Sequence, residues 1–206
     1  MKKIKRMQKE GMNMQRFFMP VVAVGLCLMV IAVSVVADSG SAIQVEKLAT
    51  AKLPVPPITV EKNYLGLSTE GFFTLPQINS EVVIIQIFSM YCPKCQAAAP
   101  KVNELFRLME RKEHVRGKVK LIGIGAGNSA YEVEVFKKTY QIPFPLFPDA
   151  DYSLHKICGE VRTPYFIGAK IDPDKSFSVF HTKLGEFDDA NQFLDQILTL
   201  SGLKEG

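Results

Sequence analysis

The feature that most constrains the fold is a short, almost continuous apolar run that leads directly to a pair of cysteines. Residues 81–88 read Glu-Val-Val-Ile-Ile-Gln-Ile-Phe, which is typical of a strand buried on both faces. Cys92-Pro93-Lys94-Cys95 follows, and apolar residues then recur at helical spacing over 98–109. The paired cysteines are therefore expected at a strand-to-helix turn, with Pro93 in the first helical turn.

The rest of the chain alternates between strand and helix patterns. A second apolar run spans 118–125, and a helix is expected next because Ser129 and Glu132 have the spacing of a capping box. Two further strands are expected at 163–168 and 177–180. A final amphipathic helix should follow, capped by Asp188 or Asp189. This order predicts an α/β fold that contains a parallel crossover.

The spacing of Cys92 and Cys95 indicates redox chemistry. At the start of a helix the two thiols can close a small disulfide ring, and so short a loop adds little stability. The helix N-terminus favours a thiolate, with some help from Lys94, so Cys92 is the better-placed nucleophile and Cys95 the thiol that attacks it in turn. A structural zinc site needs about four ligands, and Cys27 and Cys158 do not form a second pair. No metal or other cofactor is expected.

The positive charge of the chain is concentrated at its N-terminus. Residues 1–37 carry six of the 25 Lys and Arg residues and one of the 21 Asp and Glu residues. The remainder, with 19 basic and 20 acidic residues, is close to neutral, so no nucleic-acid partner is expected. Residues 17–37 contain no charge and match the ~20 residues that cross a bilayer core. We expect either a membrane anchor at 17–37 or a signal peptide cleaved after Ala37, with the rest of the chain exported.

Residues 38–59 are expected to link this segment to the folded domain. Leu53-Pro54-Val55-Pro56-Pro57 contains three prolines in four positions, which favours an extended spacer. The sequence thus predicts a signal peptide or anchor at 1–37, a Pro-rich linker at 38–59 and one folded domain at 60–206.

Several segments resemble the thioredoxin-like superfamily. The strand from Val82 to Phe88, the Cys92-Pro93-Lys94-Cys95 motif and Pro100 look like a thioredoxin active-site segment. Thr163-Pro164, just before an apolar strand, is similar to the cis-proline that faces the dithiol in this family. The N-terminal segment and the extra residues before Pro164 resemble the extracytoplasmic TlpA and ResA-like branch. Residues 145–151 are also similar to the alkyl hydroperoxide reductase and thiol-specific antioxidant proteins, which belong to the same redoxin superfamily.

This resemblance implies a thioredoxin-like fold, in which helices flank a central mixed β-sheet, and a thiol:disulfide oxidoreductase activity. Cys92 and Cys95 would form the redox-active disulfide, and Pro164 would complete the catalytic site. The substrate surface would comprise Tyr91, Pro93, Lys94 and Thr163. By the same resemblance, the protein would reduce disulfides of protein substrates, with apocytochrome c as one example. It would act at the periplasmic face of a bacterial inner membrane, with electrons from a membrane thiol-transfer donor.

Two positions depart from the family pattern. Tyr91 stands where these proteins often have tryptophan, so the substrate surface is expected to differ. Gln86 occupies the position at which thioredoxins keep a buried carboxylate that helps to move the proton of the second cysteine. An amide cannot take a proton, so Cys95 must lose its proton to water or to another group. Glu160 and Asp151 are candidates, although a surface position is the commoner environment for a carboxylate.

Two other functions stay open. A redoxin-type peroxidase would use Arg162, which lies where peroxiredoxins place an arginine beside the reactive thiolate, but Ile85 stands where their motif has proline. A copper chaperone similar to the Sco proteins would pair the cysteines with a histidine such as His181, but those proteins separate their cysteines by three residues. Cys158 is expected to be a small buried residue, with a third redox thiol as the alternative.

Overall fold

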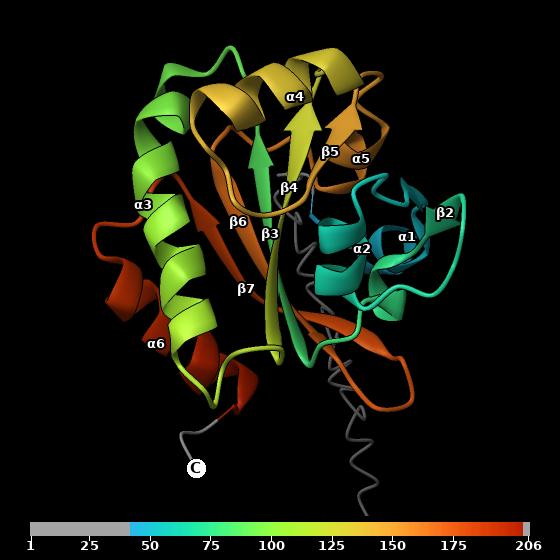
Figure 1. Cartoon of the computed structure of the whole chain (residues 1–206), viewed down its shortest axis with the longest axis vertical. Coiled ribbons are helices and arrows are strands. Elements are labelled where there is room, and N and C mark those ends of the chain that lie inside the picture. The colour runs from blue at the N-terminus through green and yellow to red at the C-terminus, as the bar shows by residue number, and fades with distance from the viewer. Residues whose placement is uncertain (1–41, 204–206) are drawn as a thin grey trace, which may run out of the picture. The chain divides into compact units, whose positions relative to one another are not determined.

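A five-stranded sheet with helices on both faces forms the centre of the domain (Figure 1). The computed structural model describes residues 42–203. The strand order is β5-β4-β3-β6-β7, in which β3, β4 and β5 are parallel, β6 pairs antiparallel with β3, and β7 pairs antiparallel with β6. Their bounds are β3 (Val82–Phe88), β4 (Val119–Ala126), β5 (Leu146–Asp149), β6 (Tyr165–Ile171) and β7 (Phe177–Leu184). The mixed α/β sheet expected from the sequence is therefore confirmed.

β3 lies at the centre of the sheet, and all seven of its residues are buried. Val82, Ile84 and Phe88 pack in one hydrophobic cluster with α3 (Pro93–Arg111). Val83, Ile85 and Ile87 pack in a second cluster on the opposite face of the sheet. Side chains alternate between the faces of a strand, so burial on both sides requires a continuous apolar run. The end of β3, where the cysteine turn begins, consequently lies at the carboxyl edge of the three parallel strands (Figure 1).

Different sets of elements cover the two faces. The face that holds Cys95 is covered by α3, α4 (Ala130–Thr139) and α6 (Ala190–Ser201). Successive right-handed crossovers from β3 to β4 and from β4 to β5 bring α3 and α4 to this same face. The other face is covered by α1 (Val45–Thr50), β1 (Leu53–Pro54), α2 (Thr59–Leu65), β2 (Phe72–Phe73), the 3₁₀-helix η1 (Leu75–Gln77) and α5 (Ser153–Ile157).

The helices begin at the expected capping residues. The Ser129 hydroxyl accepts from the Glu132 N–H at 3.3 Å, and the Glu132 carboxylate accepts from the Ser129 N–H at 2.7 Å, so a capping box opens α4. The Asp189 carboxylate accepts from the Gln192 N–H at 2.8 Å and caps α6. These contacts satisfy N–H groups that have no partner within their own helix.

Residues 38–59 differ from the expected linker. α1 and β1 lie within this range, and Leu48 and Leu53 are 0% and 1% exposed. The Gln44 N–H also donates to the Ile157 carbonyl at 2.9 Å, which ties the segment to α5. The expected boundary at residue 60 is therefore too late, because a proline-rich pattern reports local extension and does not report what the extended chain packs against.

The expected membrane segment at 17–37, with its possible cleavage after Ala37, lies outside the described residues. Within residues 42–203, no helix has the length and apolar character needed to cross a membrane.

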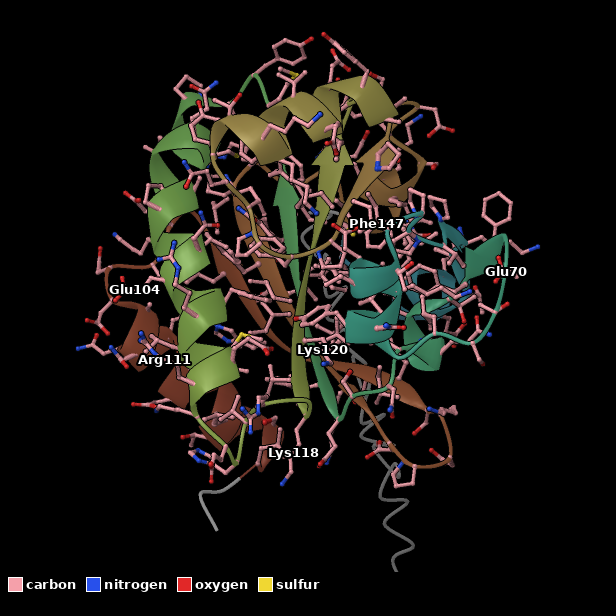
Figure 2. The ribbon with its side chains drawn as sticks, in the orientation of Figure 1. Glu70, Glu104, Arg111, Lys118, Lys120 and Phe147 are labelled. Carbon is pink, nitrogen blue, oxygen red and sulfur yellow. The ribbon has the colours of Figure 1, made fainter. Side chains whose placement is uncertain are left out.

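The start of β4 depends on a side chain from α2. β5 pairs with β4 only from Gly123 onward, so the outward-facing amide of Leu121 has no strand partner on that side. The Tyr64 hydroxyl accepts from this N–H at 2.8 Å. The ammonium of Lys120, which Figure 2 labels, lies 4.3 Å from the centroid of the Tyr64 ring. Burial raises the pKa of Tyr64, which keeps the hydroxyl neutral. Tyr64 thereby fixes α2 to the sheet.

Replacing Leu48 with alanine should lower the free energy of unfolding by about 2–5 kcal/mol, because the change leaves a cavity at a fully buried position. Val60→Ala, at a side chain that is 75% exposed, should change this free energy by no more than about 0.5 kcal/mol. Urea denaturation followed by circular dichroism measures both. Equally small effects in the two variants would mean that residues 45–54 behave as a linker after all.

Candidate active site

The cysteines lie at the junction of β3 and α3, as the sequence predicts. Cys92 is the N-cap residue of α3, Pro93 is its first helical residue, and Cys95 lies in its first turn. Cys92 is partly exposed, whereas Cys95 is fully buried in the cluster beneath α3. Neither cysteine is in a disulfide, so this is the reduced dithiol.

Two side chains that the sequence pattern did not single out hold the turn before Cys92. The Met90 N–H donates to Asn128 Oδ1 at 2.8 Å, and Gln96 Nε2 donates to the Met90 carbonyl at 2.7 Å. Asn128, just after β4, is fully buried. Both backbone groups of Met90 are thus paired, which fixes the approach of the chain to Cys92. In the sequence, Asn128 could have been noticed as a polar residue that follows the Gly-rich end of a strand expected to be buried.

Hydrogen bonds lower the pKa of the Cys92 thiol. Burial is the largest single influence and by itself raises this pKa, but hydrogen bonds from the side chains of Thr163 and Cys95 and from the backbone of Cys95 and Lys94 together outweigh it. The backbone donors belong to the helix N-terminus, whose N–H groups lack partners within the helix. When protonated, the Cys92 thiol donates to the Thr163 carbonyl oxygen at 3.3 Å, and the lowered pKa is the net result of all these contacts. Cys92 is therefore the thiol that ionises more readily.

The Cys95 thiol has the opposite character. Its pKa is raised to about 12, chiefly by burial; a backbone hydrogen bond from Ser89 and a side-chain one from Thr163 lower it, and the hydrogen bond and negative charge of Cys92 raise it. Cys95 consequently keeps its proton while Cys92 is ionised. One accessible thiolate and one buried, protonated thiol form a site suited to thiol–disulfide exchange.

Thr163 lies against Cys92, and Pro164 follows it in the chain. The peptide bond between Thr163 and Pro164 is cis. They precede β6, whose first residue, Tyr165, pairs with Ile87 near the end of β3. Pro164 is buried, and its carbonyl accepts from the Gly185 N–H at 2.8 Å. The end of β3, the start of β6 and the residue after β7 therefore meet at the cysteines.

Tyr91 and Lys94 lie on the exposed rim of the site. Tyr91 is 65% exposed, and its hydroxyl donates to Glu132 of α4, whose other carboxylate oxygen caps Ser129. This contact ties the residue before Cys92 to α4. Lys94 is exposed and, together with Thr163, lines a groove of about 570 Å³.

The carboxylates considered for the proton of Cys95 lie elsewhere. Gln86 is 3% exposed and, by strand alternation, faces the α3 side of the sheet. Asp151 is exposed and accepts from the Ser153 N–H at 3.1 Å at the start of α5, and Glu160 is exposed after that helix. Within residues 42–203, the groups that shift the pKa of Cys95 include no carboxylate.

The remaining candidates are not part of the dithiol site. Cys158 is fully buried on the opposite face of the sheet from Cys95, and burial raises its pKa to about 12. This confirms the small buried residue rather than a third redox thiol. His181 pairs with Gly168 within the sheet, and its ring centroid lies 6.1 Å from that of Phe193. In the part of the chain that the structure describes, no three His, Cys, Asp or Glu residues are placed to hold a metal ion.

Comparisons with known proteins match this geometry. The model of the AhpC/TSA family matches residues 53–176, and no curated protein matches the sequence. A secreted disulfide oxidoreductase of Mycobacterium tuberculosis, homologous to E. coli DsbE, is 15% identical, with a TM-score of 0.53 over 75% of this chain and 98% of that one.

Two further solved structures are similar. M. tuberculosis DsbF, in mixed oxidised and reduced forms, is 15% identical, with a TM-score of 0.54 over 76% of this chain and 98% of that one. A thiol:disulfide interchange protein of the thioredoxin family from Chlorobium tepidum is 18% identical, with a TM-score of 0.50 over 66% of this chain and 88% of that one. At these identities the likeness shows the thioredoxin-like fold.

Replacing Thr163 with valine should raise the pKa of Cys92, because valine keeps the β-branched shape but cannot donate a hydrogen bond to the thiolate. Cys92 would then be less ionised at neutral pH and would react more slowly with iodoacetamide. Thr163→Ser keeps the hydroxyl and should titrate like the parent protein. The pH dependence of Cys92 alkylation, followed by mass spectrometry, measures the difference. Identical midpoints for the valine and serine variants would exclude this hydrogen bond as a cause.

Proposed function

The chain belongs to the AhpC/TSA family and has the paired thiols of a thiol:disulfide oxidoreductase, and we propose that it reduces disulfide bonds in protein substrates through Cys92 and Cys95. The observation that carries this proposal is the asymmetry of the two thiols. Cys92 is accessible and its pKa is lowered, whereas Cys95 is buried and its pKa is raised to about 12.

The first step uses the accessible thiol. The Cys92 thiolate attacks one sulfur of the substrate disulfide, the substrate S–S bond breaks, and the departing substrate sulfur leaves as a thiolate that takes a proton from water. A mixed disulfide then joins Cys92 to the substrate. Cys95 stays unreactive during this step, because its protonated thiol is a poor nucleophile.

The second step uses the buried thiol. The Cys95 thiol loses its proton and its sulfur attacks the Cys92 sulfur, so the bond between Cys92 and the substrate breaks as the Cys92–Cys95 bond forms. The second substrate sulfur leaves as a thiolate and takes up one proton, so that no net proton is released. Two electrons have then passed from the dithiol to the substrate. In the mixed disulfide, Cys92 no longer carries a negative charge or accepts a hydrogen bond as a thiolate, and both effects raise the pKa of Cys95 in the reduced protein. Loss of these two contributions lowers the pKa of Cys95 at the step in which its thiolate is needed, while burial, the largest cause of the raised pKa, remains.

We also propose where the protein works and what supplies its electrons. The segment 17–37 would hold the domain at the outer face of a bacterial inner membrane, or release it there after cleavage at Ala37. A dithiol carried by a membrane protein would reduce the Cys92–Cys95 disulfide after each turnover. Protein substrates in this compartment would include those whose cysteines must stay reduced, such as apocytochrome c.

A redoxin-type peroxidase is the second candidate, and the AhpC/TSA family match over residues 53–176 favours it. Here the Cys92 thiolate would attack a peroxide oxygen and become a sulfenic acid as hydroxide leaves. Cys95 would then condense with the sulfenic acid to give the same disulfide and water. The oxidation rates of the pre-reduced protein by hydrogen peroxide and by insulin disulfides distinguish the two functions.

Cys95→Ser should accumulate a mixed disulfide with insulin, because the intermediate can form but cannot be resolved, whereas Cys92→Ser should lose insulin reduction almost completely. Cys158→Ala, on the other face of the sheet, should keep turnover and serves as the control. Non-reducing electrophoresis and insulin turbidity measure these outcomes. Full turnover by Cys95→Ser would refute the two-cysteine mechanism.

The reduction potential of the Cys92–Cys95 pair should lie near that of thioredoxin, about −270 mV, if the protein acts as a reductant. Equilibration with glutathione or dithiothreitol buffers, followed by alkylation of the free thiols, measures it. A value near that of DsbA, about −120 mV, would assign the protein to disulfide formation instead.

A further inference from the structure

A groove with a volume of about 570 Å³ lies beside Cys92, lined by residues on either side of that cysteine in the sequence and by the segment that faces it. Ser89, Lys94 and Thr163 all line it. Thr163 is also the residue whose carbonyl oxygen lies 3.3 Å from the Cys92 sulfur. A polypeptide whose disulfide meets Cys92 can therefore place its neighbouring residues in this groove.

The charged side chains of the groove are cationic and unpaired. Lys94 and Arg162 both line it and are exposed, and no Asp or Glu belongs to its lining. Across residues 42–203, neither cation has a carboxylate partner within ion-pair distance. His155 also lines the groove, but its Nε2 is engaged with the Val161 carbonyl at 2.8 Å. Two free cations beside one cavity attract a carboxylate, and Arg162 can bind one with two parallel hydrogen bonds.

The groove also offers apolar contact surface. Tyr152 and Leu184 line it and are 48% and 49% exposed, which is unusual for large apolar side chains. The Tyr152 ring rests on Gly127, where a Cβ atom would lie 2.2 Å from the tyrosine hydroxyl oxygen. The φ of +67° at Gly127 favours glycine, and the absence of a side chain there leaves room for the end of the Tyr152 ring. The groove therefore combines apolar contact surface with two cations, a lining that matches a peptide with both apolar and acidic residues.

We propose that this groove binds the substrate segment next to the reactive cysteine and selects segments that carry Asp or Glu. The inference rests on the proposed function, because it names the class of disulfide that reaches Cys92. The occupant is an unfolded or exposed segment of an exported protein whose cysteine has acidic neighbours. In this arrangement Lys94 contacts the segment close to the reactive sulfur, and Arg162 contacts it further along the groove, past Thr163.

The test compares two short peptides, each with one internal disulfide, that differ only in carrying Glu or Gln next to the cysteines. The full-length protein is pre-reduced and mixed with each peptide, and the second-order rate constant of its oxidation is measured by quenching with an alkylating reagent. The Glu peptide should react about 5- to 10-fold faster at low ionic strength, the size expected for one or two exposed ion pairs. The preference should shrink as salt is added.

Variants assign the preference to the groove. Lys94→Gln and Arg162→Gln should each reduce the Glu-to-Gln rate ratio, and the double variant should bring it close to one. The ratio is taken on the same protein, so any change in the intrinsic reactivity of Cys92 cancels. Arg111→Gln is the matched control, because it removes the same charge at the opposite end of α3 (Figure 2) and should leave the ratio unchanged.

The possible outcomes distinguish a failure of the selectivity proposed for the groove from a failure of the proposed disulfide reductase activity. Equal rates with the two peptides, or a preference that survives in the double variant, would overturn the selectivity of the groove and leave the reductase intact. If neither peptide oxidised the protein, the reductase proposal would fail, and the role of the groove would fail with it.

Discussion

Burial of β3 on both faces is the constraint on which the rest of the structure depends. The strand has partners on both edges and apolar clusters above and below, so its position and direction are determined at every residue. Its carboxyl end then delivers the chain to the N-terminus of α3, where unpaired N–H groups point toward Cys92. A redox thiol needs this placement, because a helix N-terminus stabilises negative charge only within its first turn.

The same burial makes the two thiols unequal. Cys92 stands at the N-cap and meets solvent, whereas Cys95, one helical turn further, points into the cluster between α3 and the sheet. Desolvation disfavours the charged form of a thiol, so the buried cysteine holds its proton. The contacts of Asn128 and Gln96 to Met90 preserve this arrangement, because a shift of the turn would change the exposure of both sulfurs. The two thiols thus differ through burial and through the hydrogen bonds that reach Cys92 at the start of α3, not through their own chemistry.

The proposed role of the groove is to add selectivity to a site whose exchange chemistry accepts many disulfides. Exchange between a thiolate and a disulfide depends mainly on thiol pKa and access, so any exposed disulfide is a potential substrate. Unpaired charges beside the sulfur bias the encounter toward oppositely charged segments without altering the exchange itself. Lys94 and Arg162 lie far apart in sequence and meet in one groove only because Thr163-Pro164 folds back against the start of α3.

Patterns of local origin could be predicted from the sequence. The apolar run at 81–88, the capping box at Ser129 and the cap at Asp189 each depend on neighbouring residues, and each proved correct. The segment 45–54 was mistaken for a linker, because the burial of Leu48 depends on elements far along the chain. Asn128 escaped notice for the same reason, since its partner Met90 lies 38 residues earlier.

By itself, therefore, the sequence determined the class of fold and the position of the cysteine pair at the start of a helix, and it predicted Cys92 as the nucleophile. Only the tertiary structure decided the difference in pKa between Cys92 and Cys95, the separation of Cys158 from them by the sheet, and the meeting of Lys94 with Arg162. The physical reason is that a spacing pattern reports which residues share a helix or strand face, whereas desolvation and charge pairing depend on distances between segments that only packing brings together.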